Sequence, residues 1–213
     1  IANDVLVVKE ALEIMFKQGH NKLTIGSCCL EEYKKIALAR LNKSIAFDQK
    51  ENMYYACMGL VEETGEIIAE LRKPLFKGNF HEKPLDTEEI KKELGDLMWY
   101  IALICKNANI DTDQLKDIEI KEDAKISKRE RIIQIAINMG QVSGQIVEKY
   151  LKLYNENTNN VELIEEINRQ YENICNLAEK FNLTIDEILE ENIRKVNFRY
   201  NEKGENQNNG QEK

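Results

Sequence analysis

Two acidic pairs with helical spacing are the residues of this sequence best suited to chemistry. Glu63 and Glu66 stand three positions apart, and so do Glu93 and Asp96. Acidic residues fill 38 of the 213 positions, and about seven pairs of this spacing are therefore expected by chance. Similar pairs elsewhere are interpreted as solvated helix faces: Glu119/Glu122, Glu162/Glu165 and Glu187/Glu190. Spacing alone therefore does not identify a site.

The position of the two pairs on their helices separates them from the others. At about 100° per residue, Glu93 falls within an apolar stripe, with Asp96 at its edge; that stripe consists of Ile90, Leu97, Ile101 and Ile104. Glu63 and Glu66 flank the stripe of the preceding helix, which consists of Leu60, Thr64, Ile67, Ile68 and Leu71. Glycines beside the carboxylates, Gly59, Gly65 and Gly95, predict close helix packing there.

Four carboxylates directed at a helix seam need protons, basic partners or a metal ion, because buried like charges repel and lose hydration. Hard divalent cations favour such oxygen ligands. The metal alternative predicts a Mg²⁺ site, which Mn²⁺ can also fill, formed by Glu63, Glu66, Glu93 and Asp96. The sequence has no EF-hand loop, which argues against calcium, and only two histidines, which argues against zinc.

The elements that would position these residues are all helical. Apolar periodicity predicts helices at 3–18, 30–42, 50–73, 87–108, 127–154, 159–181 and 184–201. Pro74 is expected to end the third of these. Capping boxes are predicted at Asp86 with Glu89 and at Thr184 with Glu187. No strand pattern occurs, so the fold class is all-α, a helical bundle.

Composition sets the organisation of the chain. With 42% hydrophobic residues, one core and a single domain over 1–200 are expected. Residues 201–213 lack apolar side chains and are expected to be a disordered tail. Because the chain starts at Ile1 and not at methionine, a preceding piece is expected to be missing.

Charge and cysteine content bear on partners and location. A net charge of −8 argues against a nucleic-acid duplex or an anionic membrane as partner. No apolar run has the length of a membrane span. Five cysteines without CxxC spacing favour a reducing, cytoplasmic location.

A weak internal repeat relates the two halves. The segment Met58–Glu70 resembles Met139–Lys149 when Gly65 is set against Gly144, and Cys105–Leu115 resembles Ala178–Ile188. The resulting pseudo-repeats are 30–115 and 127–200. In this register the four carboxylates correspond to Val142, Gln145, Glu166 and Arg169. A duplication would therefore have kept the scaffold and lost most of the acidic site in the second half.

The segments GLVEETGEIIAELRK, PLFKGN and KELGDLMWYIA resemble the MazG-like nucleoside triphosphate pyrophosphohydrolases, an all-α NTP pyrophosphatase group that includes the dimeric dUTPases. The pattern EExxE…ExxD reads here as Glu62–Glu66 and Glu93–Asp96. NIRKVNFRY matches a further pattern of the family, at Asn192, Lys195, Arg199 and Tyr200, but lies nearer the C-terminus than in short members. The resemblance is good over 30–108 and 192–200 and poor over 116–180.

The resemblance implies Mg²⁺-dependent hydrolysis of nucleoside triphosphates to a monophosphate and pyrophosphate, by a metal-activated water that attacks the α-phosphorus. Glu62 would orient or deprotonate this water. The implied substrate-binding residues are Lys73, Lys77, Asn192, Lys195, Arg199 and Tyr200. Trp99 and Tyr100 could contact a base, although packing is the expected role of Trp99. The resemblance also implies a homodimer.

Alternatives remain at this point. Lys195 and Arg199 could form salt bridges with the acidic helices and bind no phosphate. The protein could be a base-specific dUTPase or dCTPase of the same group, because the sequence does not show the preferred base. It could also be a non-catalytic helical interaction protein that retains a metal site.

Overall fold

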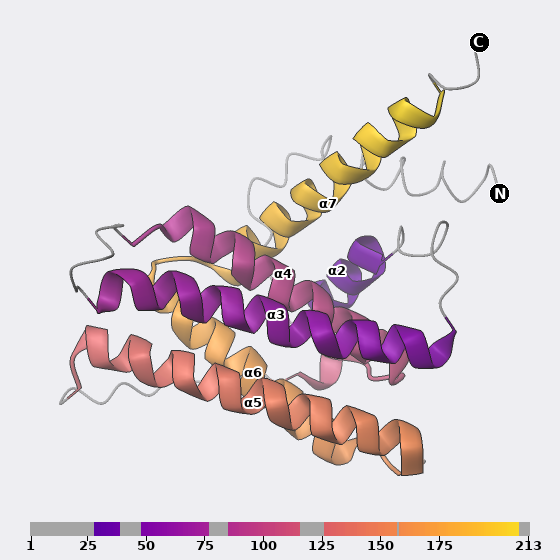
Figure 1. Cartoon of the computed structure of the whole chain (residues 1–213), viewed down its shortest axis with the longest axis horizontal. Coiled ribbons are helices and arrows are strands. Elements are labelled where there is room, and N and C mark those ends of the chain that lie inside the picture. The colour runs from indigo at the N-terminus through magenta and orange to yellow at the C-terminus, as the bar shows by residue number, and fades with distance from the viewer. Residues whose placement is uncertain (1–27, 39–47, 77–84, 116–125, 157, 209–213) are drawn as a thin grey trace.

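The computed structural model describes residues 28–38, 48–76, 85–115, 126–156 and 158–208 (Figure 1). These ranges contain helices and no strand, so the all-α fold class is confirmed. The helices are α2 (Cys28–Leu38), α3 (Gln49–Leu75), α4 (Thr87–Asn107), α5 (Lys128–Glu156), α6 (Val161–Lys180) and α7 (Ile185–Asn208), with a 3-10 turn at Thr112–Gln114. The helix expected at 3–18 lies outside the described residues.

The helices are arranged as two packed hairpins with α7 added. Helix α3 packs against α4 and α5, α5 packs against α6, and α7 packs against α4. The short α2 contacts α4 and α7. Figure 1 shows α3 and α5 side by side and antiparallel, with α7 crossing α4 and extending away from the bundle. The acidic pairs therefore lie on two helices in direct contact, and α7 reaches one of them.

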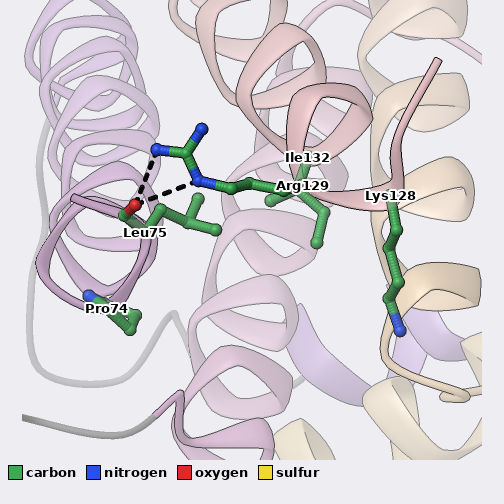
Figure 2. Close-up of a pocket in the computed structure, with 5 residues that line it drawn as sticks. All are labelled: Pro74, Leu75, Lys128, Arg129 and Ile132. Carbon is green, nitrogen blue, oxygen red and sulfur yellow. Dashed lines mark hydrogen bonds between the residues drawn. The ribbon is translucent and has the colours of Figure 1, made fainter. Parts of the chain in front are cut away.

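The ends of α3 are fixed by specific contacts. At its start, Asp48 and Glu51 form a reciprocal capping box. At its end, the helix runs to Leu75, one residue past Pro74. Arg129 of α5 donates from Nε and Nη2 to the carbonyl oxygen of Leu75, at 3.2 and 2.8 Å (Figure 2). This contact satisfies a C-terminal carbonyl of α3 that has no partner within its own helix.

Of the two predicted capping boxes, one is complete and one is formed only in part. Thr184 and Glu187 exchange backbone and side-chain hydrogen bonds, so this capping box is confirmed. Asp86 accepts from the backbone N–H groups of Glu88 and Glu89. The Glu89 carboxylate does not reach back to Asp86 and forms an ion pair with Lys92 at 2.9 Å. Only one half of the predicted box is therefore present there.

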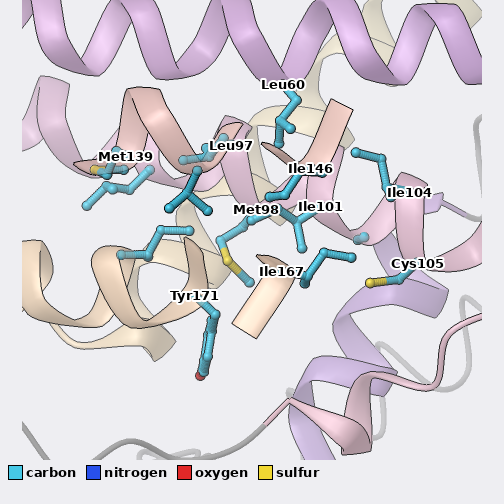
Figure 3. Packing of buried hydrophobic residues seen from close by; sticks show 14 of the residues in the cluster. Leu60, Leu97, Met98, Ile101, Ile104, Cys105, Met139, Ile146, Ile167 and Tyr171 are labelled. Atoms are coloured by element: carbon cyan, nitrogen blue, oxygen red, sulfur yellow. The ribbon is translucent and has the colours of Figure 1, made fainter. Parts of the chain in front are cut away.

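The apolar stripes meet in one core (Figure 3). Leu60 of α3, Leu97 and Ile101 of α4, and Ile146 of α5 are each at most 1% exposed. Ile68 differs from expectation, because it is only half-buried, on the side of α3 that faces Gly140. The core therefore joins both hairpins and holds the acidic pairs at its edge.

A buried polar contact crosses this core between α3 and α5. The hydroxyl oxygens of Thr64 and Ser143 lie 2.8 Å apart, and Thr64 also donates to the carbonyl oxygen of Leu60. Gln170 of α6 donates to the Ser143 hydroxyl at 2.9 Å. Because these hydroxyls are buried, a shift of α3 along α5 would leave them without partners.

Helix α7 extends into the segment that was predicted to be a disordered tail. It continues to Asn208, and residues 209–213 lie outside the described part, so the disorder of the tail stays a prediction. Extending an existing helix needs no new nucleus, and polar residues such as Glu and Lys are good helix formers. The absence of apolar side chains therefore does not end the helix.

Cys57, Cys105 and Cys175 form no disulfide bond in the described structure. Cys105 is buried and Cys175 is half-buried. Among the described helices, none is both long enough and apolar enough to cross a membrane.

Candidate metal centre

Three glutamates meet where α3 packs on α4. A carboxylate oxygen of each of Glu63, Glu66 and Glu93 lies within 4.8 Å of one from each of the others. Glu63 and Glu93 are half-buried, and Glu66 is exposed. The helical positions read from the sequence therefore bring these three predicted ligands together.

The electrostatics of this cluster are those of crowded, partly desolvated carboxylates. Burial raises the pKa of Glu63 to about 7, and the negative charges of Asp96, Glu66 and Glu93 add to the rise. The pKa of Glu93 is also raised, first by burial and then by Glu66 and Asp96. Protons thus partly neutralise the cluster near neutral pH, and a bound cation would displace them.

The donor set fits a hard divalent cation. Carboxylate oxygens are the ligands that Mg²⁺ and Mn²⁺ prefer. Among the described residues, Glu63, Glu66 and Glu93 form no ion pair with a lysine or arginine. The cluster can therefore hold a metal ion without first breaking such a pair, whereas Asp96 cannot.

Asp96 lies beside the cluster and is directed toward α7. Its Oδ1 accepts a hydrogen bond from Nδ2 of Asn192 at 2.9 Å, and its Oδ2 forms an ion pair with Lys195. The ion-pairing alternative for Lys195 is therefore observed in this structure. The metal role of Asp96 stays a prediction.

Asn192 is held in place by a residue that the sequence did not single out. It is 2% exposed, and its Oδ1 accepts a hydrogen bond from the hydroxyl of Tyr33 at 2.8 Å. Tyr33 belongs to α2, 159 positions away in the sequence. No sequence pattern connects the two residues, because their contact depends on how α2 packs against α7.

The glycines near the carboxylates have different roles. A Cβ atom at Gly95 would lie 2.9 Å from Cβ of Asn192, so Gly95 allows α7 to approach α4. A Cβ atom at Gly59 would lie 2.0 Å from the ring of Tyr100. Gly65 has nothing within 4 Å of that position. The close-packing interpretation is therefore wrong for Gly65, which faces open space.

The remaining predicted residues are placed as follows. Glu62 is exposed on α3. Lys73 forms an ion pair with Glu70 at 2.6 Å in the last turns of the same helix. Lys77 lies outside the described residues, as do the side chains of Arg199 and Tyr200, whose backbone belongs to α7. Of these predicted phosphate-binding cations, Lys73 is therefore the one whose described side chain can be placed, and it pairs with Glu70.

The aromatic residues beside the cluster differ from one another. Trp99 donates from its indole N–H to the carbonyl oxygen of Ala37 at 3.2 Å, which is the packing role expected for it. Tyr100 lies edge-on to Trp99, with ring centroids 4.9 Å apart, and 5.8 Å from the ring of Tyr55. Burial raises the pKa of Tyr100, and the charge of Glu63 contributes. Tyr55 and Tyr100 therefore form an aromatic pair next to the acidic residues.

An open pocket of about 620 Å³ lies elsewhere, between the end of α3 and the start of α5 (Figure 2). None of the acidic cluster lines it; its lining residues are Pro74, Leu75, Lys128, Arg129 and Ile132. The Arg129 guanidinium also lies 5.1 Å from the ring centroid of Phe76. We interpret this region as a clamp that joins the two helices.

Comparison with known proteins agrees with the position of the cluster. Residues 56–133 match the model of the MazG nucleotide pyrophosphohydrolase domain. The chain is also similar to the Gene 37 protein of Mycobacterium phage L5, with 33% identity over 63 residues, which is 30% of this chain and 55% of that protein. The chain thus spans about half the length of this relative. No solved structure matches.

The matched segment contains the acidic pattern and ends before α6 and α7. Asn192 and Lys195 are therefore outside it, and their role does not follow from the match. The resemblance drawn from the carboxylate pattern is confirmed: the segment that matches the MazG nucleotide pyrophosphohydrolase domain, residues 56–133, holds Glu63, Glu66, Glu93 and Asp96.

Proposed function

We propose that this protein hydrolyses ribo- or deoxyribonucleoside triphosphates to the monophosphate and pyrophosphate, with Mg²⁺ held by Glu63, Glu66, Glu93 and Asp96. One observation carries the proposal: three of these carboxylates converge within 4.8 Å, inside the segment that matches the MazG domain. The match supports nucleotide pyrophosphohydrolase activity in general. The metal and the triphosphate substrate are the finer steps of the proposal.

When bound, magnesium would polarise the phosphoryl oxygens and lower the pKa of a water molecule that attacks the α-phosphorus. The glutamates would hold the ion from α3 and α4, whose apolar faces are buried in the core. Glu62 lies on α3, next to Glu63 in sequence, and is exposed to solvent. From there it would orient the attacking water or accept its proton.

Cations of the chain would bind the phosphates. Lys195 lies at the edge of the cluster, where its charge lowers the pKa of Glu63 and Glu93 against the other effects. With Arg199 it would stabilise the charge that develops on the leaving pyrophosphate. Asn192 and Tyr200 would hydrogen-bond the nucleotide, and Lys73 and Lys77 would bind the phosphate tail.

The first test is pyrophosphate release from a panel of all common NTPs and dNTPs, measured with Mg²⁺, with Mn²⁺ and with EDTA. We expect metal-dependent release equimolar with the monophosphate, with Mn²⁺ able to replace Mg²⁺. Strong preference for dUTP or dCTP would identify a base-specific enzyme of the same group. Absence of release from every nucleotide would contradict the proposal and favour a non-catalytic interaction protein.

We further propose a homodimer, as the family resemblance implies. Sedimentation equilibrium of the full chain would measure the mass directly. A single species at the mass of one chain, 24.8 kDa, across the accessible concentration range would reject the dimer.

A further inference from the structure

Asp96 has both carboxylate oxygens occupied by residues of α7. Asn192 donates to Oδ1 and Lys195 pairs with Oδ2. The side chains of Lys195 and Asp96 are 25% and 15% exposed, respectively. The pair therefore lies in a partly buried seam, where water and salt screen the attraction less than at an open surface.

The two members of this pair are needed elsewhere if the proposed function holds. Asp96 can act as a metal ligand through Oδ2 only after Lys195 leaves that oxygen. Lys195 can act on a phosphate only after its ammonium leaves Asp96. Metal binding and phosphate binding therefore require the same ion pair to open.

Asn192 gives this change a fixed pivot. Its amide holds Oδ1 of Asp96, and the hydroxyl of Tyr33 holds Asn192 in turn. Gly95 lets the Asn192 side chain approach the α4 backbone closely. Oδ1 therefore keeps its partner while Oδ2 exchanges one.

We propose that the Asp96–Lys195 pair is a latch that couples metal binding to phosphate binding. This inference rests on the proposed function, because it assigns the metal to Asp96 and the phosphate to Lys195. The ligand that binds first opens the pair, and the second ligand then finds its group already released. By thermodynamic reciprocity each ligand strengthens the binding of the other. Lys195 is in this view also a positioning residue for Asp96 in the ligand-free protein.

The competing interpretation is a permanent salt bridge that fastens α7 to α4. Such a bridge would stabilise the fold and would not respond to ligands. The two interpretations differ in what happens to anion binding when Asp96 loses its charge. If the pair is a latch, removing the charge of Asp96 frees Lys195 to bind the anion more tightly. If the pair is a permanent salt bridge, the same change does not improve phosphate binding by Lys195.

The test is isothermal titration calorimetry of the full chain with inorganic pyrophosphate in EDTA, so that neither metal nor nucleotide is present. Wild type is compared with Asp96→Asn, Lys195→Met and the double variant. Asp96→Asn keeps the shape of the side chain and its contact with Asn192 and removes the ion pair. We expect Asp96→Asn to bind pyrophosphate about tenfold more tightly than wild type, and the same change in the Lys195→Met background to give less than about a twofold gain.

Glu63→Gln is the matched control, because it removes one negative charge from the same site and breaks no contact with Lys195. It should raise pyrophosphate affinity by about twofold, through the general loss of repulsion. The latch would be overturned if Asp96→Asn raised pyrophosphate affinity equally in the wild-type and Lys195→Met backgrounds, or if it did not raise this affinity at all. Circular dichroism of each variant verifies its helix content, and Lys195→Gln replaces Lys195→Met if the latter does not fold.

The outcome is independent of the hydrolysis assay. Absence of pyrophosphate release from nucleotides rejects the proposed function, whereas the calorimetric comparison contains no nucleotide. A second measurement titrates Mg²⁺ into the nucleotide-free protein. The latch predicts that Lys195→Met binds Mg²⁺ more tightly than wild type does. It also predicts that pyrophosphate strengthens Mg²⁺ binding in wild type, after correction for the direct binding of Mg²⁺ to pyrophosphate, and that this strengthening is lost in Lys195→Met.

Discussion

The α3–α4 hairpin can be compared with the α5–α6 hairpin in the register that sets Gly65 against Gly144. Corresponding positions are buried in both: Leu60, Ile67 and Leu71 of α3 correspond to Met139, Ile146 and Tyr150 of α5. In α4 and α6, the register that sets Cys105 against Ala178 makes Ile90, Leu94 and Ile101 correspond to Leu163, Ile167 and Ile174, which are also buried. Thr64 and Ser143, which also correspond, contact each other directly. Equivalent residues meet in this way beside a two-fold axis.

The turns that end α4 and α6 also correspond. Asn109 and Asn182 both have left-handed backbone angles, with φ of 53° and 55°. In each turn the next residue donates its N–H to the carbonyl oxygen five positions earlier, at 2.8 Å from Ile110 and 2.9 Å from Leu183. This is the same helix-ending motif. We therefore propose that the two hairpins arose by duplication, as the sequence repeat predicts.

The two hairpins differ in how the negative charges between their paired helices are neutralised. In α5–α6, Arg169 stands at the position of Asp96 and donates to Glu166 at 2.8 Å and to Gln145 at 3.2 Å. In α3–α4, the corresponding Glu93 and Glu66 meet, and no lysine or arginine of the described part of the chain forms an ion pair with them. The second hairpin thus supplies its positive charge from a side chain, whereas in the first hairpin we propose that a bound metal ion supplies it. The same helical scaffold therefore carries two differently charged helix contacts.

The largest expected effect separates these two seams directly. Glu93→Gln should lower Mg²⁺-dependent pyrophosphate release by about 100- to 1,000-fold, because a metal ligand is lost from the reacting centre. Glu166→Gln, at the corresponding position of α6, should leave release within about twofold of wild type. Steady-state kinetics of both variants measures the difference. Equal losses would show that the two seams are not functionally distinct.

A second contrast concerns the position that is Gly59 in α3 and Asn138 in α5. Gly59→Ala should lower the free energy of unfolding by about 1–3 kcal/mol, because the added Cβ would collide with the ring of Tyr100. Urea unfolding measures this change. Gly59→Ala combined with Tyr100→Leu should recover part of the loss. If Gly59→Ala alone is neutral, Tyr100 moves aside and the close contact carries no stability.

A third prediction uses pH to detect the unpaired carboxylates of the first hairpin. The pKa of Glu63 is raised from 4.5 to about 7, so the folded protein binds more protons than the unfolded chain between these values. Its contribution is therefore fully present below about pH 4.5 and is lost as the pH rises through 7. In EDTA, wild type should lose about 1–2 kcal/mol of stability over this window relative to Glu63→Gln, after allowance for solvent screening.

Thermal unfolding at several pH values, in EDTA and in Mg²⁺, measures this contrast. Glu166→Gln should follow the wild-type pH dependence, since α6 contributes no carboxylate to the cluster. Mg²⁺ should reduce the loss, because it binds the deprotonated cluster of the folded protein. A wild-type difference from Glu63→Gln that does not change with pH would contradict the raised pKa.

The smallest expected effect is the same in both hairpins. Gly65 and Gly144 correspond, and neither has an atom within 4 Å of an added Cβ. Gly65→Ala and Gly144→Ala should each raise the free energy of unfolding by about 0.5–1 kcal/mol, because alanine is the better helix former. A loss of stability in only one of them would show that its helix has a neighbour which the monomer structure does not contain.

The sequence predicts the helices and the half-buried glutamates because both follow from local periodicity. Glu93 lies inside the stripe of Ile90 and Leu97, and a 3.6-residue repeat is enough to place it there. The partners of Asp96 could not be predicted in the same way. Lys195 is 99 positions away, and its choice between Asp96 and a phosphate depends on tertiary packing. The open surroundings of Gly65 could not be predicted either, because the sequence does not show whether another helix covers a glycine's face of its helix.

The hydroxyl contact between Thr64 and Ser143 has a consequence for assembly. If the two hairpins were separate molecules, this seam would form in a bimolecular step and would come apart on dilution. Within one chain the partner is present at a fixed effective concentration, whatever the amount of protein in solution. The alignment of α3 against α5 is therefore independent of protein concentration, and so is the position of the helix that carries Glu63 and Glu66.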